Sequence, residues 1–118
     1  MLLHSRMDRL NSLFKQELSN ILLFELKDPR IGFVTITRVS LTKDLSFARV
    51  FVSVYGNQEE QDKTLEGLNS AKGFIKKRLG KIIRIRRIPE IVFKLDDSLK
   101  EGFRMSQIID KLDVHGAV

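Results

Sequence analysis

The sequence predicts an α+β fold in which one small sheet is packed with helices. Three observations carry this prediction. Apolar residues recur at helical spacing early in the chain, two β-rich stretches follow, and a basic helical stretch leads into a third strand. The expected order is helix, strand, strand, helix, helix, strand, helix. At 118 residues the chain suits one domain, 1–118, with a core over about residues 5–112 and a frayed C-terminal tail.

The first helix is expected over residues 5–27, where the apolar residues follow helical spacing. Ser5, with Asp8 three residues later, is typical of a helix N-terminus. Pro29 ends the helix, because the residue before a proline is driven out of the α region.

Residues 33–41 and 47–55 are expected to form strands, because both are rich in β-branched and aromatic residues. The polar stretch 42–46 between them is short, so the pair is expected to be an antiparallel hairpin. The second strand alternates, which predicts one apolar, core-facing side. That side consists of Ala48, Val50, Val52 and Val54.

Two helices are expected next, the first capped by Asn57 and ending near Ser70. The second is basic, and Pro89 lies beyond it. A third strand is expected over residues 91–95 and a last helix from Asp97 to about residue 112. The apolar stripe predicted for the basic helix is Ile75, Leu79, Ile82 and Ile83.

The charge is concentrated in one segment, residues 72–87. The whole chain has 21 Lys and Arg against 15 Asp and Glu, a net charge of +6. Residues 72–87 hold eight of these basic residues and no acid, so the remainder of the chain is slightly acidic. A block of one sign usually marks an interaction surface rather than a merely solvated face. The partners that suit it are polyanions, nucleic acid before an anionic membrane.

The charges that lie off the apolar stripe are predicted to project to solvent together and to contact phosphates. The arginines could also grip phosphates with two hydrogen bonds or stack on bases. Gly73 is expected to let a backbone approach closely, or to end a helix as its C-cap. The predicted RNA-binding residues are Lys72, Gly73, Lys76, Lys77, Arg78, Lys81, Arg84, Arg86 and Arg87.

Aromatic and basic residues elsewhere have two interpretations. Phe51, Tyr55 and Phe74 could stack on bases, although such residues more often belong to the core. Arg38 and Arg49 could extend the basic surface, although solvated strand charges are the simpler interpretation.

The composition argues against several function classes. Without cysteine there is no disulfide, thiolate chemistry or Cys-ligated zinc, and no metal or cofactor is expected. His4 and His115 lie near the chain ends, which is a poor setting for a catalytic triad, and Asp96-Asp97 is typical of a turn. An enzyme is therefore not expected. The longest apolar run is four residues, too short for a membrane span or a signal peptide, and a cytoplasmic protein is expected.

A helix pair that follows a hairpin and leads into a third strand is the order of a type II KH domain, which usually carries a GxxG loop between the two helices. This sequence has no GxxG and has Ala71-Lys72-Gly73 there. That A-x-G element resembles the ribosome-binding factor A family. Other stretches similar to the family are residues 27–31, 42–46 with Ala48 and Val50, 87–91 and 97–102.

The resemblance covers nearly the whole chain and implies a KH-like fold in which Ala71 and Gly73 make an interhelical kink. It implies a non-catalytic factor that binds small-subunit rRNA near the neck during late maturation and is linked to growth in the cold. The implied partners are the small ribosomal subunit and its rRNA, with no membrane and no cofactor, and a monomer is expected. Some members carry a basic C-terminal tail, whereas this chain has little basic character before Val118. A generic KH-like or integral ribosomal protein and an adaptor for an anionic surface remain alternatives.

Overall fold

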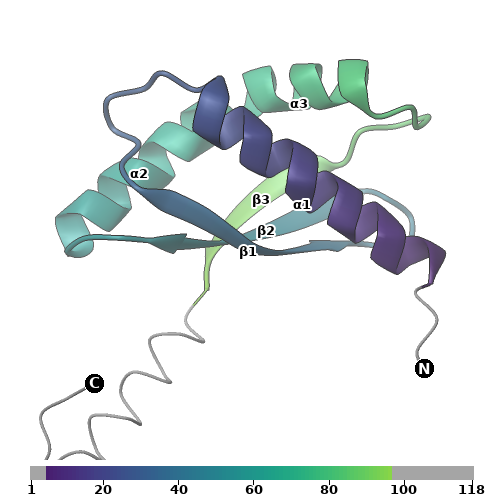
Figure 1. Ribbon diagram of the computed structural model, residues 1–118, viewed down its shortest axis with the longest axis horizontal. Coiled ribbons are helices and arrows are strands. Elements are labelled where there is room, and N and C mark those ends of the chain that lie inside the picture. Colours follow the sequence, from purple (N-terminus) through teal and green to yellow (C-terminus); the bar gives the residue numbers. More distant parts are fainter. Residues whose placement is uncertain (1–4, 97–118) are drawn as a thin grey trace, which may run out of the picture.

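The computed structural model describes residues 5–96 of the chain (Figure 1). The described elements confirm the predicted α+β class and the predicted order as far as the third strand. The last predicted helix, from Asp97 onward, lies outside the described residues. The elements are α1 (Arg6–Phe24), β1 (Val34–Leu41), β2 (Phe47–Val54), α2 (Gln58–Ser70), α3 (Lys72–Ile82) and β3 (Glu90–Leu95).

The three strands form one sheet in the order β1-β2-β3, with β2 in the centre. β1 and β2 make the predicted antiparallel hairpin, and its register shifts at a bulge between Ile36 and Arg38. β3 pairs with β2 in parallel, for example Ala48 with Ile91. Parallel neighbours require a crossover connection, and α2 and α3 supply it.

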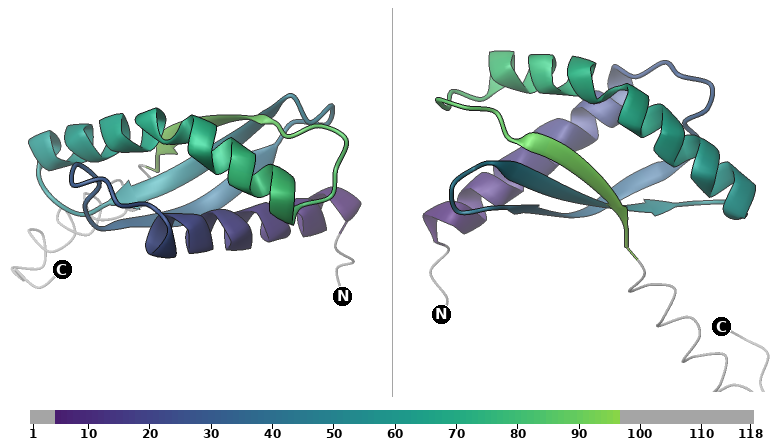
Figure 2. Two further views of the ribbon diagram at one scale, coloured as in Figure 1. Left: turned by 90° about the horizontal axis from the view of Figure 1, so that it is seen from above. Right: turned by 180° about the vertical axis from the view of Figure 1, so that it is seen from behind.

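All three described helices lie on one face of the sheet (Figure 1, Figure 2). The predicted alternation of β2 is confirmed, because its apolar side is buried against these helices. Phe14, Leu18 and Ile21 of α1 meet this side, together with Ile75 and Leu79 of α3. The core therefore lies between the sheet and the helices, and within residues 5–96 no helix covers the other face of the sheet.

Helix α1 begins as predicted and ends three residues earlier than predicted. The Ser5 hydroxyl accepts a hydrogen bond from the Asp8 backbone N–H at 3.0 Å, and the Asp8 carboxylate accepts one from the Ser5 N–H. At the other end, the Leu26 N–H donates to the Ile21 carbonyl, five residues back, which closes the last turn. The helix thus ends with this backbone hydrogen bond, several residues before Pro29, and the proline is not what ends it.

Helix α2 also carries the predicted cap, in which the Asn57 side chain accepts from the Glu60 N–H at 2.9 Å. Gly67 on its buried side meets the loop before β1. A Cβ there would lie 2.7 Å from Cγ1 of Ile31, so the glycine permits this close approach. This contact fixes α2 against the loop that leads into the sheet.

Helix α3 is shorter than the basic segment. Ile83 adopts an extended backbone, with φ −102° and ψ 124°, and α3 ends at Ile82. The predicted stripe is therefore partly wrong. Ile75 and Leu79 lie on α3 and are buried. Ile83 is also buried but follows the end of the helix, and Ile82, within the helix, is 37% exposed.

Candidate nucleic-acid interface

The face of α3 opposite the core is both basic and bare. Successive helical residues point about 100° apart, so the direction opposite Ile75 and Leu79 is occupied by residues two positions away from them. Lys77 and Lys81 lie there and are exposed, as is Gly80. This part of the predicted surface projects straight to solvent.

Gly73 lies on the same face, one residue into α3. A Cβ at this position would meet nothing within 4 Å, so no contact within the described chain requires a glycine. The C-cap interpretation of Gly73 is wrong, because the C-cap of α2 is Ala71. What the glycine provides is a surface without a side chain beside Lys77, where another backbone can approach closely.

Ala71 is the single residue between α2 and α3. Its φ of −88° and ψ of −1° leave the regular helical range, and its carbonyl accepts from the Ile75 N–H at 2.9 Å, which starts α3. Figure 2 shows the change of direction between the two helices at this point. The side chain is half-buried against the core, which suits a small residue. The break between the helices therefore lies at Ala71, with Gly73 just inside the second helix.

One flank of α3 lies beside an acid that comes from a later part of the chain. Lys76 forms an ion pair with Glu90 at the start of β3. The hydrogen bond from Lys76 lowers the pKa of Glu90, and the positive charges of Lys72 and Arg87 lower it further. Three predicted RNA contacts thus surround one carboxylate, and the charge of Lys76 is already balanced.

The other flank of α3 faces α1. The Arg78 guanidinium donates from Nε and from one terminal nitrogen to the two carboxylate oxygens of Glu25. This hydrogen bonding raises the pKa of Arg78. Arg78, which was predicted to contact RNA, also joins α3 to the end of α1 through this ion pair.

The last three predicted contacts lie beyond α3, in the extended segment 83–89. Arg84 was predicted on the helical face, and it follows the helix end by two residues because Ile83 is already extended. Arg84, Arg86 and Arg87 are exposed, whereas the apolar residues of the same segment point inward. The inward residues are Ile83, Ile85, Ile88 and Pro89.

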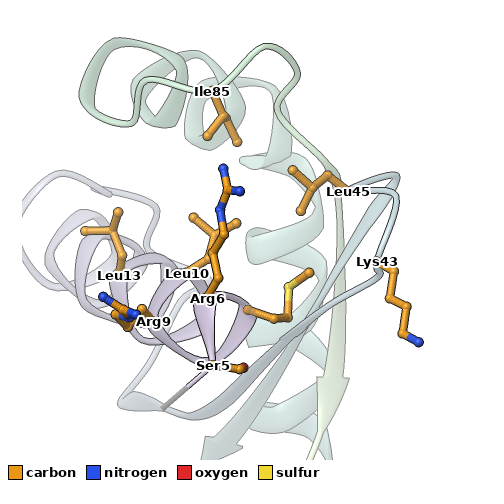
Figure 3. A pocket seen from close by; sticks show the side chains of 9 residues that line it. Ser5, Arg6, Arg9, Leu10, Leu13, Lys43, Leu45 and Ile85 are labelled. Atoms are coloured by element: carbon orange, nitrogen blue, oxygen red, sulfur yellow. The ribbon is translucent and has the colours of Figure 1, made fainter. Parts of the chain in front are cut away.

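Ile85 enters a cavity of about 640 Å³ between α1, the β1–β2 turn and this segment (Figure 3). Figure 3 shows Leu10 and Leu13 of α1 on one side and Leu45 on the other, with Arg6 beneath Ile85. Neither histidine nor acid is among the residues that line it. We infer that Ile85 holds the arginine-bearing segment against α1 here and that the cavity is not a reaction site.

The aromatic residues are more exposed than expected. Tyr55 is 80% exposed and Phe74 44%, so the core interpretation is wrong for both. Phe74 lines a shallow hollow with the loop before β1, including Lys27. Phe51 is half-buried, and the Arg38 guanidinium lies over its ring, 4.2 Å from the centroid. The alternation of β2 already contained this signal, because it places Phe51 and Tyr55 opposite the core-facing valines.

Other site types find no support in the part of the chain that the structure describes. Within residues 5–96, no cluster of three or more histidine and acidic side chains is arranged to hold a metal ion. None of the helices described there is both long enough and apolar enough to cross a bilayer.

Comparison with known proteins identifies the family. Residues 6–109 match the model of the family described as ribosome-binding factor A. Ribosome-binding factor A of Dictyoglomus thermophilum is 50% identical over 111 residues, which are 93% of this chain and 92% of that protein.

Two structures of the Thermus thermophilus factor are similar as well. The crystal structure of its ribosome-binding factor A matches with a TM-score of 0.69 and 27% identity, over 75% of this chain and 93% of that one. A homology model of the Thermus factor, fitted into a map of its complex with the 30S subunit, matches with a TM-score of 0.61 and 28% identity, over 74% and 91%. Sequence and fold thus agree, and the chain belongs to the ribosome-binding factor A family.

Proposed function

We propose that this protein binds the rRNA of the small ribosomal subunit through a basic surface and assists the late maturation of that subunit without catalysing a reaction. The basic surface is defined here as the cations of α3 and the following segment that make no ion pair within residues 5–96. It consists of Lys72, Lys77, Lys81, Arg84, Arg86 and Arg87.

One observation carries the proposal: Lys77 and Lys81 lie with Gly73 on a helix face whose opposite side is buried, and the exposed arginines follow in the extended segment. Phosphate binding needs charge that is not already balanced, and close approach of an RNA backbone needs a surface free of bulky side chains. Gly73 supplies that free surface, because a Cβ there would meet nothing within 4 Å. The Thermus relative fitted into a 30S complex supports the choice of partner.

The magnitude of the effect follows from counterion release. Each phosphate neutralised on a single strand contributes about −0.7 to the slope of log affinity against log salt, so six contacts give a slope of about −4. Lys76 and Arg78 are excluded from this count because each is paired with a glutamate. They remain close to the surface and position the helix that carries it.

The proposed mechanism is stoichiometric. A protein that binds one rRNA conformation better than another shifts the population toward it, by as much as the two affinities differ. Phosphate contacts position the protein but do not read sequence, so RNA shape would supply the specificity. Release then requires an event that removes the preferred conformation.

Two alternatives remain testable. For a lipid surface, α3 offers charge but no free apolar stripe, since Ile75 and Leu79 are buried. An integral ribosomal protein of the same fold would stay on mature subunits, whereas a maturation factor should leave. A cytoplasmic monomer, a single domain over residues 1–118 and a role in growth in the cold remain predictions.

Co-sedimentation with purified small subunits, large subunits and assembled ribosomes, at low and at high salt, tests the proposal. We expect salt-sensitive binding to free small subunits only. Equal binding to all three particles, or binding that persists on assembled ribosomes at high salt, would contradict it.

A further inference from the structure

The face of the sheet that points away from the helices carries a row of aromatic residues. On β2 the outward positions include Phe47 and Phe51, and Tyr55 continues the series directly after the strand. The three are four residues apart, and alternation places them on the same side. Phe47 is 48% exposed and Tyr55 80%, so their rings are accessible.

A fourth aromatic residue extends this row onto the neighbouring strand. The Tyr55 N–H donates to the Phe33 carbonyl at 3.0 Å, and the adjacent pair of Val34 and Val54 points to the core. Phe33 and Tyr55 are therefore direct neighbours at the end of the sheet, where they also line a hollow with Lys63 of α2, and Phe33 is 72% exposed. A contiguous group of exposed apolar side chains rimmed by polar residues is typical of an interaction site.

Cations flank the aromatic row in register. Phe51 is paired with Arg38 on β1 and with Lys94 on β3, so a positive charge lies on each side of its ring. Arg49 lies between Phe47 and Phe51 on the same side of β2. All three cations are exposed, and none makes an ion pair within residues 5–96.

We propose that this outer face is a second RNA-binding surface, on which unpaired bases of single-stranded RNA stack on Tyr55, Phe33 and Phe51 while Arg38, Arg49 and Lys94 contact the adjacent phosphates. Sheets that present aromatic rings among cations bind single strands in this way, because every base has a face that can stack. These three cations outnumber the one acid that residues 5–96 place in this part of the sheet, Asp96, which accepts a hydrogen bond from Thr37, and so favour an anionic partner over a neutral protein surface. The inference rests on the proposed function and deepens it.

The two surfaces would act together. Helix α3 lies on one face of the sheet (Figure 2), and the alternation of β2 places Phe47 and Phe51 on the other. One protein could then hold a helical or looped segment by its phosphates and a single strand by its bases. Joining two contacts in one molecule makes the second binding event intramolecular, which raises the overall affinity without new contacts.

The test uses the full chain and exploits its single tyrosine. Tyr55 is the only tyrosine in the sequence, so incorporation of 3-fluorotyrosine gives one ¹⁹F resonance from this ring. The probe is an oligouridylate of about twelve nucleotides, within the site sizes of single-strand-binding folds. An abasic ribose-phosphate strand of the same length keeps the phosphates and removes the bases.

We expect the oligouridylate to shift the Tyr55 resonance and the abasic strand to leave it in place. Tyr55→Leu should weaken oligouridylate binding by about fivefold or more, with an unchanged salt dependence, while Tyr55→Phe should bind as the wild type does. Phe24, 74% exposed on α1, supplies the matched control, and Phe24→Leu should change affinity by less than about twofold. Thermal unfolding checks that each variant is folded.

An unshifted resonance, or an equal effect of Tyr55→Leu and Phe24→Leu, would overturn the proposal. A resonance that moves with protein concentration and not with RNA would also overturn it, because the face would then bind a second copy of the chain. The basic surface is read out separately by Lys77→Ala with Lys81→Ala. If that variant shows a reduced salt slope while Tyr55→Leu binds normally, the second surface fails and the proposed function stands.

Discussion

Replacing Lys77 and Lys81 by alanine tests whether the cations of α3 that make no ion pair within residues 5–96 are the ones that bind RNA. Both side chains are exposed and make no ion pair within residues 5–96, so each is expected to neutralise one phosphate. Losing two contacts should reduce the magnitude of the log–log salt slope by about 1.4. The same relation predicts binding about 25-fold weaker at 0.1 M salt and about tenfold weaker at 0.2 M.

The matched control removes a cation together with its acid. Lys76→Ala with Glu90→Ala leaves the net charge unchanged and deletes the ion pair between α3 and β3. Its salt slope should equal that of the wild type. The assay is the affinity for small-subunit rRNA at several salt concentrations, with the fold of each variant checked by circular dichroism. If both double variants change the slope equally, the pairing of a lysine with an acid makes no difference to its contribution, and the assignment of the basic surface is refuted.

Further predictions concern glycine packing, the hairpin turn and the anchored segment. Gly73→Ala should leave thermal stability unchanged or raise it by up to about 1 kcal/mol, because its Cβ meets nothing, whereas Gly67→Ala should lower it, because its Cβ would clash with Ile31. The Ser46 and Thr42 side chains and the Ser46 N–H hydrogen-bond to the Asp44 carboxylate and lower its pKa from 3.8 to about 2, so its stabilisation is present above pH 4 and lost as the pH falls toward 2. Urea unfolding should show that Asp44→Asn removes this acid-dependent part. Ile85→Ala should weaken rRNA binding without changing net charge, because it loosens the segment that carries the arginines.

Local periodicity explains why much of the fold could be predicted. The helical spacing in α1 and the alternation in β2 each reflect one buried face, and both faces are buried where expected. The caps at Ser5 and Asn57 could be predicted because their partners are three residues away. The end of α3 could not, since the extended backbone of Ile83 is set by packing of its side chain into the core.

The candidate site was harder to predict because its charge balance is not local. Glu90 lies 14 residues from Lys76, and Glu25 lies 53 residues from Arg78. Only the parallel docking of β3 and the packing of α3 against α1 bring these acids to the basic segment. A count of charges along residues 72–87 therefore overestimates the free positive charge of the surface.

If the basic surface lies against small-subunit rRNA, directed hydroxyl-radical cleavage should map the contact. The chain has no cysteine, so Gly73→Cys gives a single attachment point for an iron chelate, at a position where a side chain meets nothing. Asp62→Cys, exposed on α2, is the control. We predict strong, localised cleavage of small-subunit rRNA from position 73 and much weaker cleavage from position 62. Bound protein that cleaves no rRNA from position 73, or cleaves equally from both positions, would contradict the account.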